Sequence, residues 1–225
     1  MTTPPPPPSR SRGPKAQRLG PDQILDAAER VFAAEGFKGA SLRAIGAEAG
    51  CDPALIYYHF ESKEALLLAL LDRTLPPLHR ELCALAEARD LPVVERLWEV
   101  LRLYHRRMGH HVGLRAVIRG ELIRGVEGIA LPMKQRLLRN AEQVWSILQQ
   151  GIDAGDLRSD LEPRLGAFFL IKTFIETQDL IPQMALLVPE ARGLTLGDAA
   201  RAWFRLYWRG VAADPHQPLP DLPEL

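Results

Sequence analysis

Apolar residues recur at helical intervals along almost the whole of this chain, and this spacing is the feature that most constrains its fold. Repeated steps of three and four residues place them on one face of a helix. No segment alternates apolar and polar residues with the β-branched enrichment that is typical of strands. With 225 residues, 47% of them hydrophobic, the chain can bury a sizeable core. We therefore predict an all-α fold, with helices separated at prolines and glycines.

Two short helices are predicted near the N-terminus, after one longer helix. The longer helix ends at Gly36, the first short helix is capped by Ser41 and closed by Gly50, and the second is capped by Asp52. A pair of short helices joined by a tight turn is the pattern of a helix-turn-helix. In that motif the second helix of the pair lies in the major groove of DNA.

The sequence AGCDPALIYYHF, residues 49–60, gives the second short helix an unusual surface. Consecutive residues of a helix point about 100° apart, so Tyr57, Tyr58 and His59 cannot all face the core. With Ile56 packed inward, these three side chains project outward, where hydroxyl and imidazole groups can donate hydrogen bonds to DNA phosphates. The alternative is a three-helix substructure with surface aromatic residues and no DNA partner.

The segment from about residue 20 to residue 71 resembles the DNA-binding domain of the TetR (tetracycline-repressor-like) family of bacterial transcription regulators. The resemblance rests on AAERVFAAEGF, SLRAIGAEAG and IYYHFESKEAL, which follow one another without a gap in the match. It implies a homodimeric repressor that binds a palindromic operator in double-stranded DNA. It also implies a C-terminal helical domain in which a small-molecule effector binds and causes release of the DNA.

Carried over by position, the resemblance assigns DNA contacts to individual residues. Bases would be faced by Pro53, Ala54 and Leu55, and phosphates would be held by Ser41, Tyr57, His59 and Lys63, with Tyr58 in either role. Lys63 also lies in the first turn of the next helix, where the macrodipole disfavours a cation, and a phosphate would explain it. Many family members carry a polar residue among the three base-facing positions. Apolar side chains make no bidentate hydrogen bonds to bases, so this chain's operator is not predicted.

Four segments are predicted along the chain. Residues 1–20 form a disordered, basic, proline-rich arm, residues 21–66 the helix-turn-helix domain, residues 67–213 an effector-binding and dimerisation domain, and residues 214–225 a disordered tail. The arm carries arginines that can enter a minor groove, and a solubilising tail is the equal alternative.

The larger domain offers candidate residues for a ligand pocket and a dimer interface. Aromatic and embedded polar residues are the pocket candidates: Trp98, Tyr104, Trp145, Phe168, Thr173 and Thr177. Plain core packing is the alternative for each of them. Helices at about 162–181 and 195–212 are apolar on too many faces for an outer layer, so we expect them to pair with a second copy of the chain. Trp203, Phe204 and Tyr207 are expected to anchor that interface.

Other classes of function find little support. Formal net charge is zero, which argues against a sequence-independent architectural DNA-binding protein, because such a protein needs a basic surface. No phosphate-binding, zinc-protease or hydrolase motif occurs, so a helical enzyme is a weaker alternative, and no cofactor is expected.

Metal, redox and membrane roles are also disfavoured. The histidines at 105, 110 and 111 lack the spacing of a metal site, and we expect them at the surface. Cys51 and Cys83 are far apart in the sequence and form no CxxC motif, which suits a reducing cytoplasm. Each is either a small buried side chain or a redox sensor. No apolar run is long enough to span a membrane, and no signal peptide is indicated.

Overall fold

The computed structural model describes residues 19–124, 130–188 and 193–225, and these parts of the chain are helical, without a strand. The all-α prediction is confirmed. The predicted basic arm lies, apart from its last two residues, outside the described residues. The helices are α1 (Pro21–Gly39), α2 (Leu42–Ala49), α3 (Pro53–His59), α4 (Lys63–Glu87), α5 (Val93–Met108), α6 (Val112–Arg124), α7 (Ala130–Ala154), α8 (Pro163–Leu187) and α9 (Leu196–Val211).

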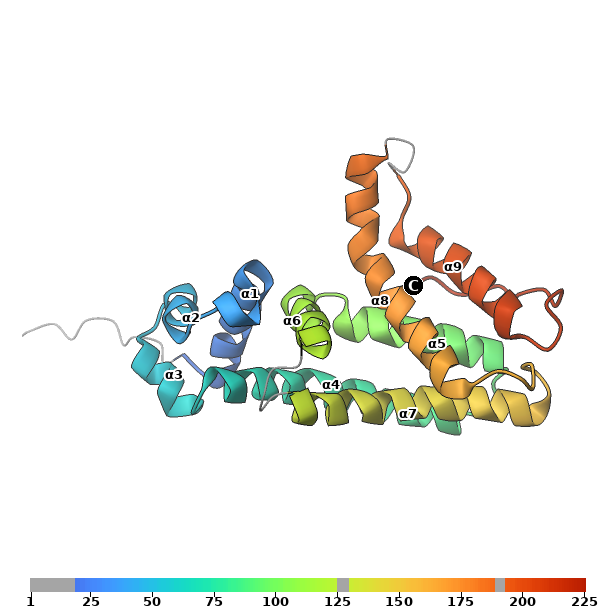
Figure 1. Ribbon diagram of the computed structural model, residues 1–225, viewed down its shortest axis with the longest axis horizontal. Helices are drawn as coiled ribbons and strands as arrows, with labels where there is room; N and C mark the ends of the chain where they lie inside the picture. The colour runs from blue at the N-terminus through green and yellow to red at the C-terminus, as the bar shows by residue number, and fades with distance from the viewer. Residues whose placement is uncertain (1–18, 125–129, 189–192) are drawn as a thin grey trace, which may run out of the picture.

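The helices are arranged as a small N-terminal unit joined to a larger one (Figure 1). Helices α1, α2 and α3 gather at one end of the molecule, and α4 runs from α3 into the larger unit, where it packs along α7. Helix α8 crosses α7 and rises from the body with α9 beside it. The predicted boundary after residue 66 falls inside α4, which therefore belongs to both units.

The N-terminal unit is built on apolar residues that the helical pattern places inward. Ile24, Phe32, Ile45 and Ile56 are completely buried and come from all three of its helices. Loss of this shared core would leave each of the short helices too short to be stable by itself, since isolated helices of fewer than about 12 residues are marginal in water. The unit therefore folds as a whole.

Helix α6 joins the larger unit to α1 by a direct approach of backbones. A Cβ atom placed on Gly113 would lie 2.1 Å from the Glu29 carbonyl oxygen, so only glycine fits there. Beside this contact, Nδ1 of His111 lies 2.8 Å from both carboxylate oxygens of Glu29. Arg73 of α4 reaches the same helix through an ion pair of 2.8 Å with Asp26. Helix α1 is therefore bound to both helices that come from the larger unit.

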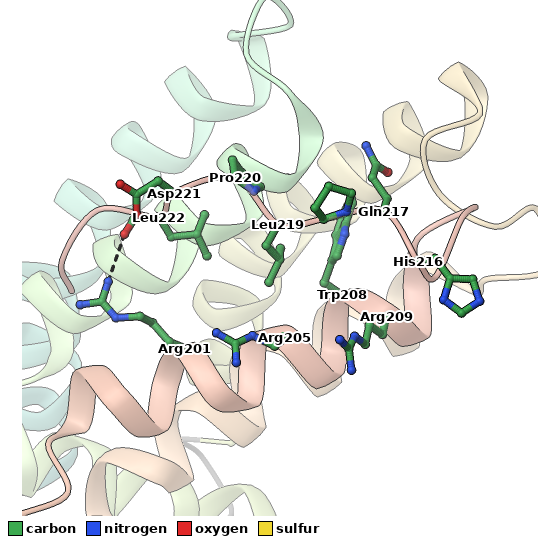
Figure 2. A pocket seen from close by; sticks show the side chains of 11 residues that line it. Arg201, Arg205, Trp208, Arg209, His216, Gln217, Leu219, Pro220, Asp221 and Leu222 are labelled. Carbon is green, nitrogen blue, oxygen red and sulfur yellow. Dashed lines mark hydrogen bonds between the residues drawn. The ribbon is translucent and has the colours of Figure 1, made fainter.

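The C-terminal segment does not behave as the disordered tail that the sequence predicts. Residues 214–225 form no helix, but they fold back along α9 (Figure 2). Nε1 of Trp98 donates to the Pro223 carbonyl at 3.0 Å, Nη1 of Arg201 donates to the Leu222 carbonyl at 3.0 Å, and the Leu222 side chain is buried. The prediction is wrong because these donors lie on α5 and α9, far from the tail in sequence.

Substituting Gly113 tests whether the backbone contact between α1 and α6 stabilises the protein. We expect Gly113→Ala to lower the free energy of unfolding in urea by about 1–3 kcal/mol, because the added methyl group forces the helices apart. Gly210→Ala is the matched control, since a Cβ at Gly210 meets no atom within 4 Å and alanine favours helix. Equal stability of the Gly113 variant and the natural chain would contradict the contact.

Candidate nucleic-acid interface and ligand cavity

The turn between α2 and α3 fixes the position of α3 closely. Oδ1 of Asp52 caps α3 by accepting from the Ala54 amide at 2.8 Å, and the Cys51 amide donates to the Gly46 carbonyl at 2.9 Å. A Cβ on Gly46 would lie 3.0 Å from the Cys51 carbonyl oxygen, so the two short helices meet with no room to spare. Gly50 closes α2 at φ 70°, in the left-handed region that favours glycine.

Most of the residues predicted to contact DNA lie on α3, with Ser41 and Lys63 outside it, but they are not equally accessible. Ala54 is exposed, and Tyr57 and Tyr58 are 60% and 82% exposed. Leu55 is half-buried and packs against the domain core. The same side chain would therefore contribute both to stability and to any contact with a base. Pro53 and His59 are also half-buried, and the His59 ring lies edge-on to Tyr58 at 5.0 Å. The freely accessible surface of α3 consists of Ala54, Tyr57 and Tyr58.

The structure corrects the reasoning applied to Lys63. Its ammonium donates to the Phe37 carbonyl at 2.6 Å and to the Ala40 carbonyl at 2.7 Å, and it lies 4.6 Å from the centre of the Phe37 ring. These carbonyls belong to the end of α1, where backbone acceptors lack helical partners. Lys63 therefore has an internal role that accounts for a cation at this position without a phosphate, and the inference drawn from the macrodipole is wrong.

Basic residues that the sequence reasoning missed lie on the same unit. Arg43 on α2 and Lys38 at the end of α1 are exposed and have no carboxylate partner among the described residues. Arg30, by contrast, forms an ion pair with Glu48 at 2.5 Å that ties α1 to α2. Ser41, a predicted phosphate contact, is exposed and caps α2 by accepting from the Ala44 amide at 3.1 Å. The signal for Arg43 was its place in the first turn after the Ser41 cap.

The larger unit contains an apolar cavity of about 400 Å³ between α4, α5, α6, α7 and α8. Three of the predicted pocket residues line it: Tyr104, Trp145 and Phe168. Burial raises the pKa of the Tyr104 hydroxyl, which keeps it protonated as a donor. A cavity of this size lies within the range of small-molecule sites.

The other three predicted pocket residues lie elsewhere. Trp98 is buried on the other side of α5, where it packs on Phe204 at 5.2 Å between ring centres and holds the tail. Thr177 donates to the Thr173 carbonyl of its own helix at 2.8 Å, and neither threonine lines the cavity. These predictions are wrong because helical periodicity shows which residues face inward but not which of two neighbouring interfaces they reach.

The polar groups of the cavity are mostly cationic. Arg115, Arg119, Arg164 and Lys172 line it together with a single carboxylate, Glu176. Behind the wall, Asp179 accepts from Arg115 at 2.6 Å and pairs with Arg119. Arg164 has no carboxylate partner among the described residues and lies 5.8 Å from the centre of the Trp145 ring.

One buried amide on the cavity wall is only half satisfied. Asn140 is 2% exposed, and its Oδ1 lies 3.1 Å from Nδ1 of His79. Its Nδ2 has no hydrogen-bond partner in the described part of the chain. Because buried donors are rarely left unpaired, this amide is a candidate to donate to a ligand.

The predicted dimer anchors on α9 mostly face their own chain. Phe204 is completely buried against Trp98, and the Tyr207 hydroxyl donates to the Gly166 carbonyl of α8 at 3.0 Å. Trp203 is half-buried beside Tyr207. The prediction for Phe204 is wrong, because α9 uses its aromatic face to bind α5 and α8. The large apolar residues that are exposed in the described parts of α8 and α9 are instead Leu165, Phe168, Phe169, Leu180, Leu186, Leu187 and Leu206.

The histidines and cysteines are placed as individual side chains. His110 is exposed, His105 lies 3.4 Å from Oε1 of Gln178, and His111 pairs with Glu29. Cys51 and Cys83 are free and half-buried, and burial raises the pKa of the Cys51 thiol, with Asp52 adding to the effect. Within the described ranges, no group of three or more possible ligands is placed to hold a metal ion, and no helix is long and apolar enough to cross a membrane.

Taken together, the capped pair of short helices and the helical unit behind it define a helix-turn-helix protein with a second, larger helical unit. Residues 24–70 match the family profile described as "Bacterial regulatory proteins, tetR family". The chain is therefore similar to this family in its DNA-binding region. Its relatives are regulators of transcription, not enzymes.

The relatives resemble this chain most closely in the DNA-binding region. The HTH-type transcriptional regulator UidR of Escherichia coli is 43% identical over 49 residues, which are 22% of this chain and only a quarter (25%) of UidR. The HTH-type transcriptional repressor DhaR of a Mycobacterium species is 27% identical over 162 residues, or 67% of this chain and 76% of DhaR.

Solved structures share the fold over most of the length. The structure of the regulator FadR of Bacillus subtilis in complex with stearoyl-CoA matches 84% of this chain and 98% of the FadR chain. The TM-score is 0.66 and the sequence identity is 22%. The structure of the ketosteroid transcriptional regulator KstR2 of Mycobacterium tuberculosis matches 90% of this chain and 99% of the KstR2 chain. The TM-score is 0.68 and the sequence identity is 22%. At these identities the likeness establishes the fold alone.

Replacing Lys63 distinguishes its internal role from a role at a phosphate. We expect Lys63→Met to lower the free energy of unfolding by about 1–3 kcal/mol in the absence of DNA, because two carbonyls of α1 lose their donor. Lys38→Met, at an exposed neighbouring site, is the control and should change it by less than about 0.5 kcal/mol. If both variants unfold like the natural chain, the ammonium is free for a phosphate after all.

Proposed function

We propose that this protein is a ligand-responsive repressor that binds a palindromic operator as a homodimer and works in the bacterial cytoplasm, where the DNA is. The observation that carries the proposal is the accessible surface of Ala54, Tyr57 and Tyr58 on a helix whose position is fixed by tight capping and close packing. Tyrosine hydroxyls suit phosphates and the alanine methyl suits a thymine methyl. The match of residues 24–70 to the TetR family profile supports this assignment of α3 to the major groove.

The homodimer is proposed to form through α8 and the outer face of α9. Helix α8 carries Leu165, Phe169, Leu180 and Leu187 at intervals of four, eleven and seven residues, which place them along one face, and all four side chains are at least half exposed. A row of this kind is unusual on the surface of a monomer. Pairing with the same row of a second copy buries it and sets two α3 helices on one duplex, as a palindrome requires.

The effector is proposed to be an elongated apolar molecule with an anionic head group. The cavity walls are apolar, whereas its charged groups are four cations and one carboxylate. Arg164 lies at an exposed position and has no carboxylate partner among the described residues, so it is suited to receive the head group. The FadR structure of this fold contains stearoyl-CoA, which combines an apolar chain with anionic groups.

Communication between the cavity and the DNA surface is proposed to run through α6. Arg115, Ile118 and Arg119 of α6 line the cavity, and Gly113 of the same helix touches the α1 backbone. A ligand that binds only one of two positions of α6 shifts the protein toward the conformation with that position, and the DNA-binding unit moves with it. Equal affinity for both positions would shift nothing.

DNA titration at several salt concentrations tests the assignment of α3. We expect Tyr57→Phe to weaken binding to operator and scrambled duplex alike, by about 0.5–1.5 kcal/mol, with an unchanged salt slope because no charge is lost. Ala54→Gln should change the preferred operator sequence and leave non-specific binding as it was. The operator duplex for these titrations is identified by footprinting the DNA upstream of the gene. We expect each operator duplex to bind two copies of the chain.

Two results would contradict the proposal that α3 binds the operator through its exposed side chains. If the natural protein binds operator and scrambled duplex equally, it is an architectural DNA-binding protein. If Tyr57→Phe binds both duplexes as tightly as the natural chain, its hydroxyl contacts no phosphate.

Two ligands with the same chain and opposite head groups test the effector class. Below their micelle concentrations, we expect dodecanoate to raise the melting temperature and weaken operator binding, and dodecyltrimethylammonium to do neither, because the cavity is cationic. Ala141→Phe, which fills part of the cavity, should abolish the response to dodecanoate. Equal responses to both head groups would show that charge plays no part in selecting the ligand.

A further inference from the structure

A second pocket lies between α9 and the C-terminal tail, far along the chain from the DNA-binding unit (Figure 2). Its volume is about 450 Å³. One wall is α9 and the other is the tail from His216 to Leu222, which is held in place through the carbonyls of Leu222 and Pro223. The pocket is therefore a product of the folded tail, and it is separate from the apolar cavity described above.

The helical wall of this pocket has a strong positive charge. Arg201, Arg205 and Arg209 follow one another at steps of four residues and all line it, while Asp221 is its single carboxylate. Arg201 donates to the tail, but Arg205 and Arg209 have no carboxylate partner in the described ranges. Like charges four residues apart on a helix destabilise it, so this row is unfavourable unless an anion offsets it.

An unpaired donor in the same pocket is independent of these charges. Trp208 lines the pocket, is 2% exposed, and rises from α9 toward the tail in Figure 2. Its Nε1 has no hydrogen-bond acceptor among the described residues. The indole nitrogen of Trp98, which also meets the tail, does have one in the Pro223 carbonyl. Because an indole N–H only donates, the missing partner of Trp208 is an acceptor.

We infer that this pocket binds a small molecule that carries a phosphate group. The planar guanidinium groups of Arg205 and Arg209 match the oxygen atoms of a phosphate, and the Trp208 indole supplies a third donor group. A volume of about 450 Å³ exceeds the needs of a free phosphate ion, and Pro218, Leu219 and Pro220 offer the rest of the molecule an apolar wall. The tail thus serves as part of a binding site.

Calorimetric titration of the full chain with inorganic pyrophosphate, at constant ionic strength and without DNA, tests the inference. We expect saturable binding that is weakened at least about tenfold in the double variant Arg205→Gln/Arg209→Gln, because charge-assisted hydrogen bonds to phosphate are lost. Both arginines are exposed, so this variant should fold, as its melting temperature without ligand will show. Trp208→Phe removes the N–H together with part of the buried ring, so its melting temperature is measured as well, and it should weaken binding by a smaller factor.

Two controls separate this site from the DNA-binding surface and from net charge. Arg80→Gln/Arg89→Gln removes two exposed arginines elsewhere and should leave pyrophosphate binding unchanged. Arg43→Gln changes the DNA-binding unit and should also leave it unchanged. The inference is overturned if no saturable binding occurs, if the double variant binds like the natural chain, or if Arg43→Gln abolishes binding. The proposed repressor function survives each of those outcomes, because it is judged by operator binding.

Discussion

The close contact between α1 and α6 is the constraint on which the relation of the two units depends. Packed helices usually lie 8–10 Å apart, at a distance set by the side chains between them. At Gly113 no side chain intervenes, and the Glu29 carbonyl meets the α6 backbone directly. The Glu29 side chain continues the contact through His111. Two surfaces that fit this closely move together or separate, and they cannot slide by small amounts without loss of packing.

Charge is balanced over the whole chain but not at its sites. The formal net charge is zero, yet the apolar cavity is lined by four cations and one carboxylate, and the tail pocket by three arginines and one carboxylate. Carboxylates are used elsewhere in ion pairs, such as Glu48 with Arg30 and Asp72 with Arg136. Local placement, and not total charge, therefore decides which ligands each pocket attracts, because charges interact over distances of about a Debye length.

The aromatic residues show where sequence reasoning reaches its limit. On the sequence alone, Trp98 and Tyr104 are pocket candidates and Phe204 is an expected dimer anchor, and all three are buried within their own chain. Their neighbours could not be predicted, because each depends on which helix packs on which. Tyr104 faces the cavity, whereas Trp98 and Phe204 pack on each other and leave the outer row of α8 to exposed leucines and Phe169.

The sequence by itself determined the all-α class, the helix-turn-helix and the resemblance of residues 20–71 to a TetR DNA-binding domain, because caps, turns and helical spacing are local properties. It also determined that aromatic side chains of α3 point outward, and Tyr57 and Tyr58 do. Only the tertiary structure decided that Lys63 binds the end of α1 and that the tail folds onto α9. It also decided that a cavity with apolar walls and four cationic side chains lies beside α6. Each of these rests on atoms 20 or more residues apart, and no local pattern encodes the distance between them.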